Sequence, residues 1–134
     1  MPETLASLEK GYRFPPASFD LSPDWVAEYI SATEDTSAAT LGEFVPPMAL
    51  AALAIRALLS QSGLPPGAIH VAQDLAFARS VSVGEALTAS AEVSSRGERA
   101  GWVLMSVGLR VEDGSGDPVM IGRATITFPA GAGA

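Results

Sequence analysis

Apolar residues surround one segment of the chain on nearly every side. Between Pro46 and Gly63, alanine, leucine and methionine dominate, and Arg56 is the only charged residue. These residue types favour a helix; proline fits its first turn, and glycine suits the position after its last turn. A helix of about 15 residues is too short to cross a bilayer, and one that is apolar all round must be enclosed. The segment therefore predicts a core helix of a soluble domain.

The chain before this segment predicts a second helix. Ser22-Pro23-Asp24 is typical of a helix start, because serine caps, proline fits the first position and aspartate favours the positive end of the helix dipole. Apolar residues then recur at helical spacing up to about Thr33. Around this helix we expect a loosely held end, a short edge strand stopped by prolines, and a polar loop, at residues 1–10, 11–16 and 34–42.

After Gly63 the pattern changes to the alternation of β-strands. Stretches rich in valine, isoleucine, threonine and aromatic residues predict four strands, at residues 68–78, 86–95, 101–112 and 118–128. The separators contain turn residues, at 83–85, 96–99 and 113–117. Short separators favour antiparallel pairing of consecutive strands. The glycine- and alanine-rich tail, residues 129–134, predicts no regular structure.

The order of these elements suggests one architecture. An antiparallel sheet of about five strands that curves around the apolar helix would enclose it, and this resembles the hotdog fold, an α+β fold. We expect a single such domain over residues 1–134, with loose ends at about 1–10 and 129–134. The alternative is a cone-shaped α+β fold of the nuclear-transport-factor type, in which amphipathic helices pack outside a polar cone. The all-round apolarity of residues 48–59 favours the hotdog fold.

Composition and charge exclude several kinds of function. The net charge of −7 argues against a nucleic-acid partner, because such partners require neutralisation of phosphates. With no cysteine and a single histidine, disulfides and thiolate catalysis are excluded, and we expect neither a metal site nor another cofactor. The N-terminus lacks a basic segment that leads into an apolar one, so we expect a cytoplasmic protein without a membrane partner.

Five motifs, in this order along the chain, carry a resemblance to a known family: Tyr29-Ile30-Ser31-Ala32-Thr33-Glu34-Asp35, Val45-Pro46-Pro47-Met48, Gly67-Ala68-Ile69-His70, Arg79-Ser80-Val81-Ser82-Val83-Gly84-Glu85-Ala86-Leu87 and Gly122-Arg123-Ala124-Thr125. They resemble motifs of the MaoC-like dehydratases, the hotdog family that includes the (R)-specific enoyl-CoA hydratases, over roughly residues 12–128. The resemblance implies acyl-thioester chemistry in fatty acid metabolism. Water would be added to, or removed across, the double bond of an acyl chain held on coenzyme A or acyl carrier protein.

The catalytic pattern of that family is incomplete in this sequence. The family pattern resembles Asp-x-Asn-Pro-x-His, and its aspartate falls on Asp35 while its histidine falls on Thr40, which cannot act as a base near neutral pH. A family His-Gly pair, whose backbone N–H would stabilise the thioester oxyanion, falls on Pro46-Pro47. Pro47 has no N–H, so Met48 N–H is the nearest remaining donor. Loss of one such donor commonly costs about 10²–10³ in rate.

Three further residues have both a functional and a structural interpretation. His70, where the chain enters a strand, could transfer a proton or line an acyl pocket, and we favour a structural role. Glu43 could activate water, as in a hotdog thioesterase, although a solvated charge near a helix start is the simpler interpretation. Arg56 could contact the pyrophosphate of coenzyme A or a dimer partner, or extend its head from the core into solvent.

The resemblance therefore implies a MaoC-like protein with a degenerate site of its own. The Pro-Pro opening is similar to the non-catalytic halves of double or heterodimeric MaoC-like dehydratases, so we expect a homodimer, or a heterodimer with a catalytic hotdog subunit. Two alternatives stay open. The chain is an active hydro-lyase or acyl-CoA thioesterase that uses Asp35, Glu43 or His70 in an altered geometry, or it is a hotdog module that binds an unrelated small ligand without catalysis.

Overall fold

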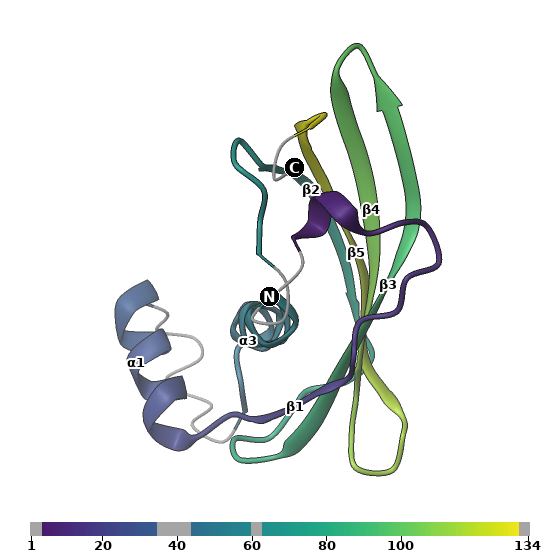
Figure 1. The fold of residues 1–134 in the computed structure, drawn as a ribbon. Helices are drawn as coiled ribbons and strands as arrows, with labels where there is room; N and C mark the ends of the chain where they lie inside the picture. The colour runs from purple at the N-terminus through teal and green to yellow at the C-terminus, as the bar shows by residue number, and fades with distance from the viewer. Residues whose placement is uncertain (1–3, 35–43, 60–62, 132–134) are drawn as a thin grey trace.

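Five strands form one curved antiparallel sheet in the computed structural model, which describes residues 4–34, 44–59 and 63–131. The elements, in chain order, are η1 (Leu5–Ser7), β1 (Ala17–Asp20), α1 (Pro23–Thr33), α3 (Pro47–Leu59), β2 (Ile69–Phe77), β3 (Ala86–Arg99), β4 (Trp102–Glu112) and β5 (Pro118–Pro129). The strand order is β1-β3-β4-β5-β2. Figure 1 shows α3 against one side of the sheet and α1 further out on the same side. The predicted α+β hotdog architecture, an antiparallel sheet around one long apolar helix, is confirmed.

The helix α3 buries one side and leaves the other exposed. Ala49, Leu50 and Ala54 are each at most 2% exposed and face the sheet, where α3 packs mainly against β1 and β3. On the other side the Met48 side chain is 55% exposed. The described residues therefore enclose α3 less completely than its all-round apolarity predicts, because nothing among them covers this second face.

The helix α1 begins and ends as its sequence predicts. The Ser22 hydroxyl accepts a hydrogen bond from the Trp25 backbone N–H at 3.2 Å, so it satisfies one of the unpaired donors of the first turn. Glu34 ends the helix in the left-handed conformation, with φ of 54°. Packing of Val26, which is 3% exposed, then fixes α1 to the rest of the fold.

The first strand lies later in the chain than predicted. Within residues 11–16 only Arg13 forms a β-bridge, to Glu92, and regular pairing with β3 starts at Ala17 opposite Ala89. Pro15 and Pro16 explain the difference, because neither has an N–H to donate to a ladder.

The turn between β3 and β4 also differs from its prediction. Residues 96–99 are paired with β4, and Gly97 lies opposite Leu104 within the ladder. The chain reverses at Ala100 and Gly101, whose φ angles of 54° and 84° supply the left-handed pair that a tight hairpin needs. Gly97 is tolerated in a strand, so the glycine there did not mark the turn.

The N-terminal segment is packed rather than loosely held from Thr4 onward. Leu5 and Leu8 are only 1% and 2% exposed, because they cover one end of the hydrophobic core. Leu5 N–H donates to Gly63 O at 3.0 Å, and Arg96 Nη1 donates to Leu8 O at 3.0 Å. At the other end of the chain, β5 extends to Pro129, one residue into the tail that was predicted to be irregular.

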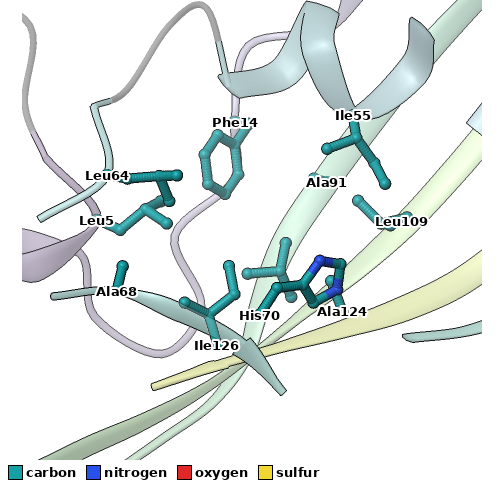
Figure 2. A pocket seen from close by; sticks show the side chains of 11 residues that line it. Leu5, Phe14, Ile55, Leu64, Ala68, His70, Ala91, Leu109, Ala124 and Ile126 are labelled. Carbon is teal, nitrogen blue, oxygen red and sulfur yellow. The ribbon is translucent and has the colours of Figure 1, made fainter. Parts of the chain in front are cut away.

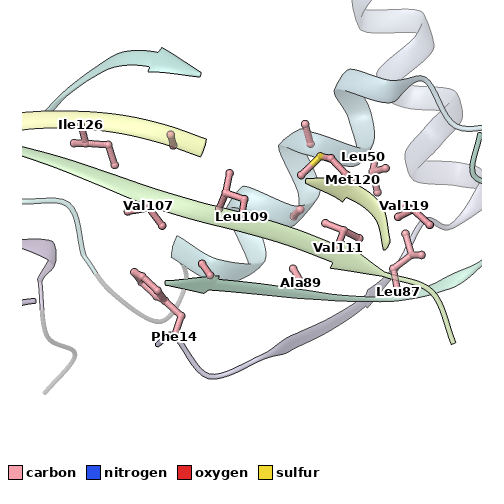
Figure 3. Close-up of a cluster of buried hydrophobic side chains, with 14 of the residues drawn as sticks. Phe14, Leu50, Leu87, Ala89, Val107, Leu109, Val111, Val119, Met120 and Ile126 are labelled. Carbon is pink, nitrogen blue, oxygen red and sulfur yellow. The ribbon is translucent and has the colours of Figure 1, made fainter. Parts of the chain in front are cut away.

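Large apolar side chains fill one half of the concave side of the sheet. They come from α3 and from three strands: Leu50, Leu87, Val111, Val119 and Met120. Each is at most 2% exposed, and Figure 3 shows them packed together beside α3. Further along the same face, two alanines, Ala91 and Ala124, stand among larger side chains, and it is there that the fold leaves space.

Candidate functional site

A cavity of about 90 Å³ lies under the last turns of α3. This is several times the roughly 10–15 Å³ that one water-sized group needs. Its walls come from the N-terminal segment, α3, the segment before β2, and strands β2 to β5: Leu5, Phe14, Ile55, Leu64, Ala68, His70, Ala91, Val107, Leu109, Ala124 and Ile126. Ten of these eleven side chains are apolar, so the cavity suits a hydrocarbon group (Figure 2).

The floor of the cavity is low because two strands carry alanine where their neighbours carry larger residues. Ala91 of β3 lies opposite Leu109 of β4, and Ala124 of β5 lies opposite Val107. Both alanines point to the concave side and are less than 10% exposed. Their side chains end at Cβ, so the space that a leucine or methionine would fill stays open.

The roof of the cavity is formed by segments outside the sheet. Phe14 is 4% exposed, and its N–H donates to Ala91 O at 2.9 Å, which holds the ring over the strands. Tyr12 packs edge-on against Phe14, with ring centroids 5.2 Å apart. Leu64 and His70 line the cavity and are also exposed to solvent, so the cavity opens beside them.

His70 faces the cavity because of its register in the sheet. It pairs with Ile126 of β5, whose side chain points to the concave side, and a bulge at Val71 follows before pairing resumes at Ala72. Figure 2 shows the imidazole among the apolar lining residues. Within the described part of the chain no side chain or backbone group forms a hydrogen bond with the ring. Of the candidate catalytic residues, His70 is the one that the structure places at a cavity.

The start of α3 offers a single backbone donor. Pro46 O accepts from Ala49 N–H at 2.9 Å and from Leu50 N–H at 3.3 Å, while Pro47 has no N–H. Met48 N–H has no acceptor among the described residues and is therefore the donor that this helix end presents. A ligand contact of Met48 N–H stays a prediction.

The candidate residues do not form one cluster in the described structure. Asp35, Thr40 and Glu43 lie outside the described residues. Ile55, the residue of α3 that lines the cavity, is eight positions after Pro47, about 12 Å along the helix axis. Arg56 is exposed on α3 and forms no ion pair with any described residue. The two cavity alanines were missed at the sequence level, although small residues at inward positions of two strands of one sheet are a signal that could have revealed them.

The strongest electrostatic cluster lies away from the cavity. Arg79 Nη2 is 2.5 Å from Glu85 Oε1 and 2.9 Å from Asp113 Oδ2. The hydrogen bond from Arg79 is the main cause that lowers the pKa of Glu85 and the pKa of Asp113 below their ordinary values. These three groups join the loop after β2 to the turn after β4, so Arg79 is committed to a structural role.

Two kinds of site find no support in the described residues. In residues 4–34, 44–59 and 63–131, no group of three or more histidine, aspartate or glutamate side chains lies close enough together to hold a metal ion. None of the described helices combines the length and apolarity that spanning a bilayer requires.

A curved antiparallel sheet around a central helix defines the hotdog fold, and solved structures with this fold match nearly the whole chain. An (R)-hydratase from A. caviae involved in PHA biosynthesis is 27% identical, with a TM-score of 0.73 over 92% of this chain and 98% of that one. A MaoC-like dehydratase from Rhodospirillum rubrum is 16% identical, with a TM-score of 0.72 over 94% and 96%. The (3R)-hydroxyacyl-ACP dehydratase complex HadBC from Mycobacterium tuberculosis is 21% identical, with a TM-score of 0.73 over 92% and 100%.

The last two similarities bear on the fold alone, whereas the hydratase is also the more similar in sequence. No protein-family model matches the sequence, and no curated protein matches it either. The chain has the hotdog fold of the MaoC-like dehydratases and (R)-hydratases, and the resemblance predicted from its motifs is confirmed.

Proposed function

We propose that this chain binds an acyl thioester and supplies the acyl-chain pocket of a MaoC-like hydratase or dehydratase. The observation that carries the proposal is the cavity under α3, whose lining is apolar except for His70. Burial of an apolar chain there is favourable by about 25 cal/mol for each Å² removed from water. The similarity to an (R)-hydratase of 27% identity supports the acyl-thioester class of ligand.

The residues at the catalytic positions support a binding role rather than full catalysis. Thr40 stands where the family pattern has its base, and Pro47 stands where the pattern has a backbone donor. A carboxylate such as Asp35 does little acid–base work without its partner. Because both a base and an oxyanion donor are replaced, hydration of an enoyl thioester by this chain alone should be very slow.

A second hotdog chain would complete the site. The outer edge of β2 pairs with no strand in the described structure, and Ile69 and Val71 on it are 54% and 55% exposed. Unpaired strand edges of this kind favour association with another chain. One structural relative, HadBC, is itself a dehydratase complex, which supports a hotdog partner that carries the complete catalytic pair.

The distribution of arginine supports the same division of roles. Four of the eight basic residues form ion pairs with carboxylates: Arg13, Arg79, Arg110 and Arg123. Half of the basic residues are therefore already paired and less available to the phosphates of a carrier. Arg56 forms no ion pair among the described residues, but it follows the cavity residue Ile55 at the end of α3 away from Met48, so under this proposal it lies nearer the acyl chain than the phosphates of the carrier.

Cavity-filling variants test the binding role. Octanoyl-CoA should bind the wild-type chain in calorimetry, and Ala124→Leu, which fills the floor, should weaken binding at least tenfold. Ala91→Leu is a second filling variant from another strand, and Ala72→Leu, on an exposed residue of β2 outside the cavity, is the matched control that should bind normally. Thermal unfolding shows that each variant is folded. Failure of octanoyl-CoA to bind, or unchanged binding by folded Ala124→Leu and Ala91→Leu, would refute the proposal.

An activity assay separates the binding role from an active hydratase. We expect no measurable hydration of 2-octenoyl-CoA by the purified chain alone, as followed by loss of the enoyl absorbance. Turnover by the chain that Asp35→Ala or His70→Ala abolishes would show instead that it is a hydratase with an altered site. A thioesterase assay with octanoyl-CoA, repeated with Glu43→Ala, tests the remaining enzymatic alternative in the same way.

A further inference from the structure

His70 is the one side chain in the lining of the cavity that can form a hydrogen bond. The other ten lining residues carry hydrocarbon side chains, and none is charged. The imidazole lies with Ile126, its partner in the ladder, on the concave side of the sheet, and Figure 2 shows it directed at the space beside Ala124 and Leu109. Its two ring nitrogens have no protein partner in the described structure, so they are available to a ligand.

An apolar ligand that fills this cavity would cover the part of the imidazole that lines it, at the place where the cavity opens to solvent. A polar group that loses water without gaining a hydrogen bond costs free energy, and it disfavours ligands that cannot supply a partner. Sites that hydrogen-bond a ligand hydroxyl can reject the analogue without it by large factors, whereas an apolar pocket hardly distinguishes the two. His70 therefore gives the cavity a means of selection that its apolar walls lack.

The position of His70 along the site determines which part of an acyl chain it would meet. Under the proposed function, the thioester lies at the start of α3, where Met48 presents its N–H. The cavity lies beside Ile55, about 12 Å further along the helix axis. A group that reaches His70 is therefore several carbons beyond the thioester, and it differs from the oxygen at carbon 3 on which hydratase chemistry acts.

We propose that His70 recognises an oxygen on the distal part of the acyl chain, so that the cavity selects a chain with a hydroxyl or oxo group there over a plain hydrocarbon chain. This inference rests on the proposed function and names its class of substrate. Imidazole both donates and accepts hydrogen bonds, so either oxygen group fits its chemistry. His70 is thus a specificity-determining residue, and no proton transfer is required of it.

Positional isomers of one acyl thioester test this inference. The probes are octanoyl-CoA and its 3-, 5-, 6- and 7-hydroxy derivatives, with dissociation constants measured by calorimetry. We expect at least one of the 5-, 6- or 7-hydroxy isomers to bind wild type about tenfold or more tightly than octanoyl-CoA, which is about 1.4 kcal/mol. The 3-hydroxy isomer should show no preference that depends on His70. In His70→Leu the distal preference should disappear, while octanoyl-CoA binds at least as well as in wild type.

Two controls make the result specific to the imidazole. Gln73→Leu removes a polar side chain from the same strand that does not line the cavity, and it should leave the preference unchanged. His70→Gln keeps a hydrogen-bonding group and should retain part of it. The inference is overturned if wild type prefers no distal hydroxy isomer, or if the preference survives in His70→Leu. Failure of the proposed function looks different, because then neither octanoyl-CoA nor its derivatives bind.

Discussion

At the scale of single residues, Gly122 allows β5 and β2 to approach each other closely. A Cβ on Gly122 of β5 would lie 2.5 Å from Leu75 Cδ2 and 2.6 Å from Asp74 O, both on β2. A Cβ on Gly108 of β4 would lie no closer than 3.8 Å from its nearest neighbour, Glu92 O. The two glycines are therefore not equivalent, since only Gly122 is required by packing.

We predict that Gly122→Ala destabilises the protein by about 1–3 kcal/mol, because backbone atoms of β2 must shift to admit the methyl group. The midpoint of urea denaturation measures the change. Gly108→Ala is the matched control in the neighbouring strand, and its stability should stay within about 0.5 kcal/mol of wild type. Equal stability of the two variants would contradict the close approach of β2 and β5.

At the scale of elements, the β3–β4 hairpin contains a conformation that its residue does not favour. Ala100 has φ of 54°, in the left-handed region, where most residues with a Cβ pay a steric cost and asparagine pays less. The following residue, Gly101, adopts φ of 84° without that cost.

Ala100→Asn should therefore stabilise the protein by about 0.5–1 kcal/mol, because Asn-Gly is a preferred pair for this kind of hairpin. Gly101→Ala should have the opposite effect. Thermal and urea unfolding of the two variants measure both changes. If Ala100→Asn were destabilising, the turn would not lie at residues 100–101.

The cluster of Arg79, Glu85 and Asp113 links two loops and should make stability depend on pH. Arg79 lowers the pKa of both carboxyls in the folded state. A lowered folded-state pKa contributes stability above the unfolded-state value of about 4, and that contribution is lost as the pH falls below it.

We predict that Arg79→Met reduces the free energy of unfolding at pH 7 and that its difference from wild type shrinks as the pH falls from 5 to 3. Urea denaturation at several pH values measures this difference. Arg99→Met removes an arginine that forms no ion pair within the described residues, and its difference from wild type should not vary with pH in this range. A constant difference for Arg79→Met would show that the cluster contributes no proton-linked stability.

At the scale of the whole molecule, the β2 edge of the sheet combines exposed apolar side chains with an unpaired backbone in the described structure. Ile69 and Val71 are more than half exposed, and the backbone of this edge has no partner strand in the described structure. Pairing with a second hotdog chain would satisfy these backbone groups and cover both side chains.

The purified chain should therefore associate in solution with a mass of about twice 13.7 kDa, since in the absence of another partner a second copy can occupy the same edge. Val71→Lys should reduce the mass to that of one chain, as measured by light scattering after size-exclusion chromatography. Ser95→Lys, an exposed position on the interior strand β3, should leave the larger mass unchanged. A wild-type chain that stays monomeric at tens of micromolar, or a Val71→Lys variant that keeps the larger mass, would contradict this use of the edge.

The sequence alone determined the elements whose signals are local. Neighbouring residues in the sequence were enough to predict the apolar helix α3, the Ser22 cap of α1 and the alternation in β4. The order of these elements then indicated the hotdog fold. The motif resemblance also depended on short segments, and the structural comparisons confirm it.

Tertiary structure alone decided the features that depend on pairing between distant segments. The register of two consecutive hairpins places Ala91 of β3 and Ala124 of β5 on one floor. His70 faces this floor because β2 pairs with β5, a strand far from it in the chain. Leu5 is buried because it covers one end of the hydrophobic core. The residues next to Leu5 in the sequence give no sign of this burial. A local pattern specifies the conformation of a segment, whereas a cavity exists only where several segments meet, and for this reason the candidate site could not be located before the fold.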